Sequence, residues 1–180
     1  MTECIALLRG INVGRAKRIA MAQLRGLFVD LGHENVRTLL NSGNVLFRCA
    51  EPRTGKLALT LQGAIADRYG FPASVTVLTA ANLAAIVREN PLLHIVKEPS
   101  KHLIAFVAHP RELAPLRSLM EEKWAPDALA IGSRAGYLWC ADGVLDSKLS
   151  QAFARRGGEA VTTRNWATVL KLHAASNTPG

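Results

Sequence analysis

The chain has 180 residues, a length that suits one domain of ordinary size or two small ones. Apolar residues make up 49% and charged residues 20%, so disordered and fibrous classes are excluded. An excess of 22 basic over 14 acidic residues gives a net charge of +8, which favours an anionic partner. The sequence has no apolar run of membrane-spanning length, no secretory pattern and no CxxC pair, so we expect a cytoplasmic protein without membrane association.

The first half of the chain predicts the order β-α-β-β-α-β, followed by one short helix. Its expected elements are a strand at 4–8, a helix at 21–31, strands at 36–40 and 44–48, a helix at 57–69, a strand at 73–78 and a short helix capped by Thr79. Asn41-Ser42-Gly43 separates two of these strands, and this is the chemistry of a hairpin turn. Gly32 and Gly70 are expected to end the two longer helices.

The second half repeats this order without obvious sequence identity to the first. Its expected elements are a strand at 102–108, a helix around 116–120, strands at 128–131 and 137–141, a helix from Leu149 to Gly157, a strand at 160–162 and a closing helix from Trp166. We expect Thr163 to cap this closing helix and Trp166 to pack as its anchor. The segment 132–136 predicts a second hairpin.

This repeated order predicts an α+β protein of two tandem ferredoxin-like halves. Each half would be a β-α-β-β-α-β unit, or α/β plait, with a four-stranded antiparallel sheet and helices on one face. We expect the first half at 1–90 and the second at 102–175. Residues 91–101, with two prolines and mixed polarity, are the expected joint.

The loop LRGINVG, which follows the first strand, is the first candidate binding element. A glycine loop between a strand and a helix can present backbone N–H groups to an anion. The spacing is neither GxxxxGK[ST] nor GxGxxG, so the alternative is a turn in which the glycines adopt positive φ and Asn12 bonds its own backbone.

Basic residues gather in two segments, 9–25 and 147–171, which hold ten basic residues against the single acid Glu159. This local imbalance is the footprint expected of an anion-binding surface, and a solvated face that keeps the chain soluble is the alternative. The ten residues are Arg9, Arg15, Lys17, Arg18, Arg25, Lys148, Arg155, Arg156, Arg164 and Lys171.

Catalytic and metal-binding patterns are weak. The five histidines form no HxH or HxxxH pair, so we expect neither a metal site nor a cofactor. Ser147-Lys148 is better explained as a helix N-cap followed by a surface or anion-binding lysine than as a catalytic dyad. Tyr137 and Trp139 share one strand face, where core packing is favoured over the stacking of nucleic-acid bases.

Five segments together carry a resemblance to a known family: IALLRGINVG (5–14), MAQLRGLFVDLG (21–32), VRTLLNSGNVLF (36–47), SKL (147–149) and TTRNWATVLKL (162–172). The chain resembles a widespread bacterial family known as domain-of-unknown-function family 1697 (DUF1697). The resemblance implies two ferredoxin-like halves and brings no established activity, cofactor or catalytic residue. This chain departs from the family pattern at Arg15, where a glycine is usual. It also departs at Val144-Leu145-Asp146, where family members often have a glycine-containing run before SKL.

The preferred functional hypothesis is the binding of a phosphorylated or carboxylated ligand in a basic cleft between the halves. One alternative is an enzyme acting on an anionic small molecule, with Ser42 or Lys148 nearest to the chemistry. Another is a module that binds nucleic acid or a protein partner. The oligomeric state stays open. The candidate ligand-binding residues are Arg9, Gly10, Asn12, Gly14, Ser42, Gly43, Asn44, Lys148, Arg164 and Asn165.

Overall fold

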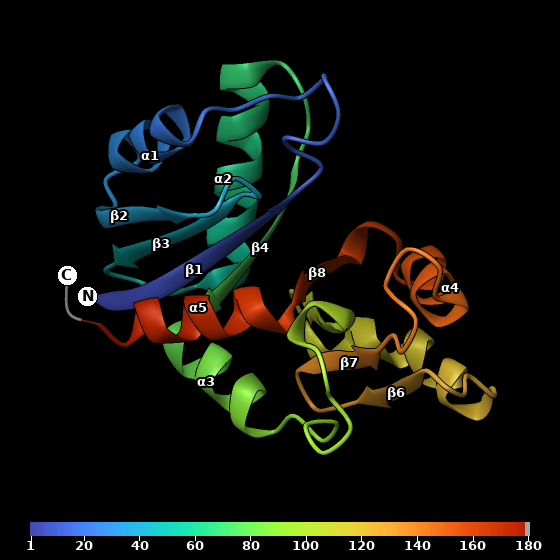
Figure 1. Cartoon of the computed structure of the whole chain (residues 1–180). Helices are drawn as coiled ribbons and strands as arrows, with labels where there is room; N and C mark the ends of the chain where they lie inside the picture. The colour runs from blue at the N-terminus through green and yellow to red at the C-terminus, as the bar shows by residue number, and fades with distance from the viewer. Residues whose placement is uncertain (179–180) are drawn as a thin grey trace. The chain divides into compact units, whose positions relative to one another are not determined.

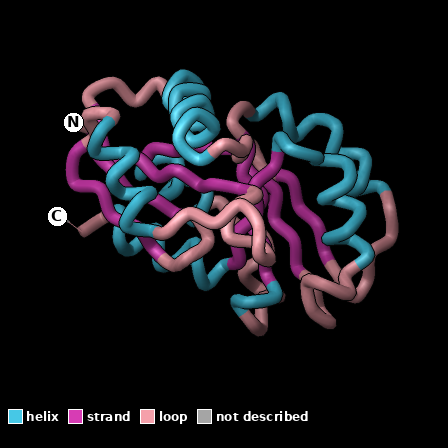
Figure 2. The backbone as a smooth tube through the Cα atoms, turned by 90° about the horizontal axis from the view of Figure 1, so that it is seen from above, coloured by secondary structure: helices cyan, strands magenta, loops and turns pink. Residues whose placement is uncertain are grey.

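Residues 1–178 are described in a computed structural model of the chain (Figure 1). The chain forms two compact units, each built on its own four-stranded sheet (Figure 2). Unit 1 comprises Met1–Leu83 and Leu172–Gly180, and unit 2 comprises Ala84–Lys171. The expected halves at 1–90 and 102–175, with the joint at 91–101, follow the order of the elements along the chain. The two units are instead defined by which residues pack together.

Unit 1 contains a four-stranded antiparallel sheet in the order β2-β3-β1-β4. β3 lies between β1 and β2, so the connection through α1 is the split βαβ of a ferredoxin-like unit. The elements are β1 (Thr2–Arg9), α1 (Met21–Asp30), β2 (Glu34–Leu39), β3 (Asn44–Cys49), α2 (Thr54–Tyr69), β4 (Ser74–Thr79) and the start of α3 (Ala80–Arg88).

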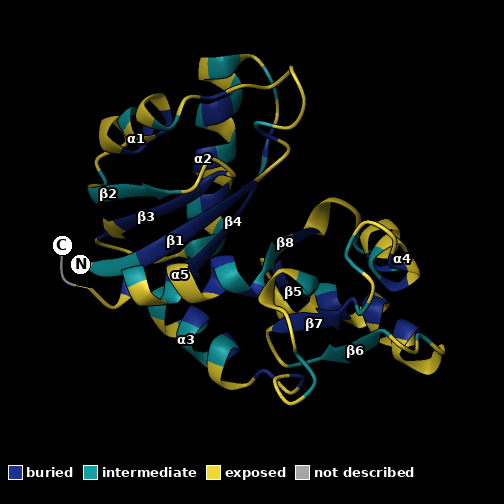
Figure 3. Cartoon of the chain, in the orientation of Figure 1, coloured by how far each residue is buried: buried dark blue, intermediate teal, exposed yellow. Residues whose placement is uncertain are grey.

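The core of unit 1 lies between one face of this sheet and the apolar stripes of α1 and α2. β1 is buried over most of its length, as the dark strand in Figure 3 shows, because both of its neighbours are strands. Gly32 and Gly70 follow the two helices with φ of +82° and +74°, a region that glycine adopts at little cost. The prediction that Gly32 and Gly70 end these two helices is therefore confirmed.

Unit 2 repeats this topology with the sheet order β6-β7-β5-β8, again antiparallel throughout. The 3₁₀ helices are η1 (Pro99–Lys101), η2 (Pro110–Glu121) and η3 (Gly158–Ala160). The strands and α-helices are β5 (His102–Val107), β6 (Ala128–Ile131), β7 (Ala135–Trp139), α4 (Lys148–Gly157), β8 (Val161–Asn165) and α5 (Trp166–Ser176), whose last residues belong to unit 1.

The helix expected around 116–120 is a 3₁₀ helix, η2, rather than an α-helix. Pro115 lies inside it and has no N–H to donate to the preceding turn, so regular α-helical bonding is interrupted there. The segment still buries Leu113, Leu116 and Leu119 against the sheet, because i, i+3 spacing serves a 3₁₀ helix well.

The core of unit 2 lies between its sheet, η2 and α4, and it includes Cys140, Leu149 and Phe153. Tyr137 and Trp139 are buried in β7, and the Tyr137 hydroxyl donates a hydrogen bond to the Ile86 carbonyl. Core packing rather than base stacking therefore explains both aromatic residues. In each unit two helical segments cover one sheet face, which confirms the α+β fold of two ferredoxin-like halves.

Candidate functional site

The LRGINVG loop leaves the end of β1 and reaches α1 through a series of tight turns. Gly10, Asn12 and Gly14 have φ of +81°, +55° and +63°. The glycines have free space where a Cβ would lie, so their conformation rather than close packing accounts for the residue type.

The side chain of Asn12 cross-links this loop through hydrogen bonds to the backbone. Its side-chain amide donates to the carbonyls of Ile19 (3.0 Å) and Asn41 (3.1 Å), and its Oδ1 accepts from the Ile19 N–H (2.9 Å). These three bonds close the loop and tie it to the turn between β2 and β3. Asn12 is therefore explained by the alternative prediction for this loop, a turn in which its side chain bonds to the backbone.

The Asn41-Ser42-Gly43 turn packs against the same end of the sheet. The Gly43 carbonyl accepts from the Leu8 N–H (2.8 Å), and a Cβ on Gly43 would lie 2.8 Å from the Leu8 Cβ. Asn44 is fully buried, and its side-chain amide donates to the Leu39 carbonyl and the Ser42 Oγ, each at 2.9 Å. LRGINVG and SGN therefore meet, as part of the turn architecture of unit 1.

A small cavity of about 380 Å³ lies beside this junction. α1 begins there after Ala20, which has no side chain that can cap the first turn of the helix. Arg18 is the one cationic side chain in the lining, and Arg9, at the end of β1, is not part of it. The lining residues, here called the loop cavity, are Asn12, Arg18, Ile19, Ala20, Met21 and Asn41.

Arg164 and Asn165 lie at the end of β8, paired with Ile104 and Leu103 of β5. Burial lowers the pKa of the Arg164 guanidinium to about 10, and its Nη1 donates to the Thr163 carbonyl (2.9 Å). Asn165 caps α5, because its Oδ1 accepts from the Thr168 N–H at 2.9 Å.

The expectation that Thr163 caps the closing helix is wrong, because β8 continues three residues beyond the expected strand at 160–162 and places Thr163 within the strand. Trp166 is buried beside the His102 ring, with ring centroids 5.6 Å apart, so it is the expected packing anchor. The convergence of Arg9 and Asn12 with Arg164 or Asn165 in one pocket stays a prediction.

Lys148 is the first residue of α4. Ser147 precedes it as the N-cap, since its Oγ accepts from the Ser150 N–H (2.9 Å). The predicted N-cap is therefore confirmed. Ser147 also donates to Asp127 Oδ2 (2.6 Å), so the start of α4 is fixed to the segment before β6.

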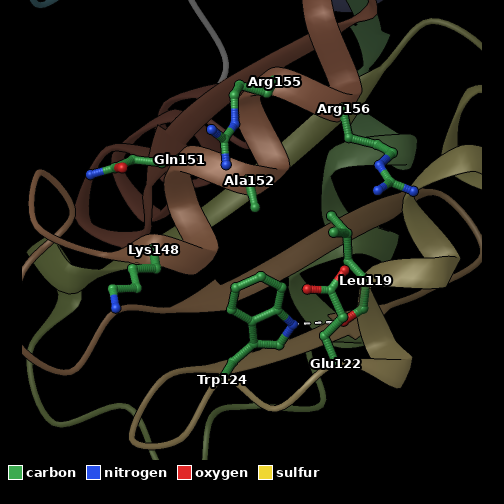
Figure 4. Close-up of a pocket in the computed structure, with 8 residues that line it drawn as sticks. All are labelled: Leu119, Glu122, Trp124, Lys148, Gln151, Ala152, Arg155 and Arg156. Atoms are coloured by element: carbon green, nitrogen blue, oxygen red, sulfur yellow. Dashed lines mark hydrogen bonds between the residues drawn. The ribbon is translucent and has the colours of Figure 1, made fainter.

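A larger surface cavity, of about 590 Å³, lies along α4 in unit 2 (Figure 4). Lys148, Gln151 or Ala152, and Arg155 follow the i, i+3/i+4, i+7 spacing that puts side chains on one helix face. Leu149 and Phe153 point instead into the core of the unit. The lining residues, here called the α4 cavity, are Leu119, Glu122, Trp124, Lys148, Gln151, Ala152, Arg155 and Arg156.

The α4 cavity carries three positive charges against one carboxylate, that of Glu122. Within residues 1–178, the side chains of Lys148 and Arg155 make no hydrogen bond or ion pair, whereas Arg156 donates to the Ser118 Oγ (2.6 Å). Cations that lack a protein partner leave their donors available for an anion.

Trp124 forms the wall opposite α4. Its Nε1–H donates to the Leu119 carbonyl (2.6 Å), and its half-buried ring packs partly against the core of unit 2. The Trp124 carbonyl accepts from the Asp127 N–H (2.9 Å), and Asp127 in turn binds Ser147. A continuous set of hydrogen bonds therefore links the Trp124 wall to the first turn of α4.

The reactive groups near this site are engaged in structural bonds. Ser147 is buried and donates to Asp127, whose other oxygen accepts from the Ala141 N–H (2.8 Å). Burial raises the pKa of the neighbouring Cys140 thiol, which disfavours the nucleophilic thiolate. Across residues 1–178, no group of three His, Cys, Asp or Glu side chains gathers where it could hold a metal ion.

Sequence reasoning placed Lys148 among the candidate residues but only counted Arg155 and Arg156 within a basic segment. Their i+7 and i+8 spacing from Lys148 is the signal that could have joined them to one site. Trp124 was missed, since it lies outside every strand and helix in a segment with no periodicity.

Comparisons with known proteins agree with this fold. The chain has 22% sequence identity to the conserved bacterial protein SP0830 from Streptococcus pneumoniae, whose solved structure it matches with a TM-score of 0.77. The match covers 98% of this chain and 99% of that one. We found no curated protein similar in sequence to this chain. In the part of the chain that the structure describes, no helix has the length and apolar character needed to cross a membrane.

The family comparison covers residues 1–137, which include LRGINVG and the SGN turn and end before Lys148. The model matched over these residues is described as "Protein of unknown function (DUF1697)", in agreement with the resemblance seen in the motifs. The chain therefore belongs to the DUF1697 family.

Proposed function

We propose that the protein binds an anionic ligand, phosphorylated or carboxylated, in the α4 cavity. The observation that carries the proposal is the pair of cations, Lys148 and Arg155, that one face of α4 directs into a cavity of about 590 Å³. Cavities of this size accept small metabolites. Seven residues of α-helix separate the two Cα atoms by about 10 Å, so both long side chains can reach a single phosphate between them.

Arg155 suits this role because a guanidinium offers directional donors in a plane, which match two oxygens of a phosphate or carboxylate. Lys148 adds a point charge at the first turn of α4, where the helix dipole also favours an anion. Arg156 lines the same cavity, and its bond to the Ser118 Oγ holds it at the cavity edge.

The bonds from Asp127 support the proposal by fixing the cavity before a ligand arrives. The Asp127 backbone N–H donates to the Trp124 carbonyl, and the Asp127 carboxylate accepts from Ser147 at the first turn of α4, so one residue holds both walls. A site that is already ordered loses less conformational entropy on binding.

The loop cavity is a weaker choice for the same function. It is smaller, Arg18 is its one cation, and the side-chain amide and carbonyl of Asn12 are already bonded to Ile19 and Asn41. Turn geometry accounts for Gly10, Asn12, Gly14, Gly43 and Asn44, so we place the ligand at α4.

Titration calorimetry with ribose 5-phosphate at low ionic strength tests the proposal. We expect measurable binding to the wild-type chain, and the variants Lys148→Ala and Arg155→Ala should each weaken it by about 10-fold or more, because each removes a charge-assisted hydrogen bond. Arg134→Ala is the matched control, since Arg134 is an exposed cation of unit 2 on the β6–β7 turn and does not line the cavity.

Affinity should also fall as salt is added, because the contacts are electrostatic. Absence of binding at millimolar ribose 5-phosphate would overturn the proposal. An equal loss of affinity in Arg134→Ala would also overturn it, because the effect would then reflect net charge rather than this site.

A further inference from the structure

The α4 cavity has an aromatic wall as well as cations. Trp124 is held at one edge by the bond from its Nε1–H to the Leu119 carbonyl, and part of its ring rests on the core of unit 2. An indole fixed in this way presents a face at little entropic cost, and such faces stack on planar rings.

The residue across from this wall is small. Ala152 extends from α4 toward Trp124 with a single methyl group, while the longer side chains of Lys148 and Gln151 project to one side (Figure 4). A larger residue at 152 would cover the indole. The helix therefore leaves the aromatic wall accessible from the cavity.

The charges of the cavity are arranged unevenly around Trp124. Lys148 lies on one side of the indole, and Glu122 lies on the other (Figure 4). A ligand with its anionic group at Lys148 and Arg155 would carry its ring over Trp124. Glu122 can then accept a hydrogen bond from an amino or hydroxyl group, but it repels a second anionic group.

From this arrangement we infer that the α4 cavity takes a free nucleoside monophosphate, an inference that rests on the proposed function. The phosphate binds Lys148 and Arg155, and the base stacks on Trp124. A single-stranded nucleic acid offers the same base and phosphate. Its chain would add a second phosphate at the ribose 3′ oxygen, and the Glu122 carboxylate repels a second anionic group in the cavity, so the free nucleotide is favoured.

Tryptophan fluorescence can follow the stacking directly. Trp139 and Trp166 are only 7% and 6% exposed, so Trp124 is the indole that a ligand in the cavity can contact. AMP should quench the emission of the wild-type chain to saturation, and ribose 5-phosphate should bind without comparable quenching. The quenching should disappear in Trp124→Phe, which lacks the indole.

Calorimetry with three probes separates this inference from the proposed function. We expect AMP to bind wild type on the order of tenfold more tightly than ribose 5-phosphate does, because one base–aromatic stack is added. Trp124→Leu should remove most of that ratio, and Trp124→Phe, which keeps a ring, should retain much of it. A six-residue oligoadenylate should bind no more tightly than AMP.

If AMP and ribose 5-phosphate bind wild type equally, the nucleotide inference fails while the proposed function stands. If neither ligand binds at millimolar concentration, the proposed function fails and the inference fails with it. Tighter binding of the oligoadenylate than of AMP would overturn the choice of a free nucleotide and identify single-stranded nucleic acid as the ligand source.

Discussion

Replacement of Gly43 by alanine should strongly destabilise unit 1. The new Cβ would lie 2.8 Å from the Leu8 Cβ and 2.9 Å from the Ile11 Cδ1, well inside normal van der Waals contact. The Leu8 Cβ is attached directly to the backbone of β1, so it cannot rotate away, and the loop or the strand must shift.

The expected destabilisation by Gly43→Ala has two parts. An alanine held at φ of +79° costs about 1–2 kcal/mol relative to glycine. Forcing an extra methyl into a packed site costs about 1–3 kcal/mol. The expected loss in the free energy of unfolding is therefore about 2–5 kcal/mol, and each kcal/mol lowers Tm by roughly 2–4 °C for a chain of this length.

Gly32→Ala provides the matched control, because Gly32 has nearly the same φ, +82°, and nothing lies within 4 Å of its Cβ position. Urea unfolding of the two variants and wild type isolates the steric part. Gly32→Ala should lose only about 1–2 kcal/mol. If Gly43→Ala loses no more than this, the close approach of the turn to Leu8 is not present in solution.

Two further predictions concern unit 2. Ser147→Ala should lower the free energy of unfolding by about 1–3 kcal/mol, because it removes the N-cap to the Ser150 N–H and leaves Asp127 without that donor; thermal unfolding measures this, and an unchanged Tm would contradict it. Burial lowers the pKa of His102 in the folded chain below its unfolded value near 6.5. The unfolded chain therefore binds a proton more readily, and stability should fall as pH drops from 7 through the folded pKa. The slope contributed by this one site is at most about 1.4 kcal/mol per pH unit; urea unfolding at pH 5–8 should show a smaller slope in His102→Asn, and a slope equal to that of wild type would contradict the prediction.

Most of the fold could be predicted from the sequence because its signals are local. Asn41-Ser42-Gly43 specifies a hairpin, Gly32 and Gly70 end helices, and Thr79 caps α3 by accepting from the Asn82 N–H. The order of these elements then leaves few topologies with short connections.

Where the prediction was wrong, neighbouring elements decided the outcome. The spacing of Leu116, Leu119 and Met120 is compatible with either kind of helix, and Pro115 favours the 3₁₀ form. Thr163 has the side chain of a cap, but pairing with Ala105 of β5 keeps it in β8, so Asn165 takes the capping position.

The candidate site was harder to predict because it depends on side chains brought together by the tertiary fold. Lys148 could be singled out as the residue after an N-cap, but nothing in the sequence relates it to Trp124, 24 positions earlier. Asp127 makes that link through Ser147, Ala141 and the Trp124 carbonyl. Conversely, Asn12, Gly43 and Asn44 looked like ligand contacts, and their polar groups serve the turns of unit 1.

The most direct test of the central claim is an NMR titration of the full chain with ribose 5-phosphate, read residue by residue. We predict that the largest amide shifts fall in the first two turns of α4, from Lys148 to Arg155, and that the Trp124 indole N–H also shifts. Shifts confined to the LRGINVG loop, or to Arg164 and Asn165, would contradict the assignment of the anion site to α4.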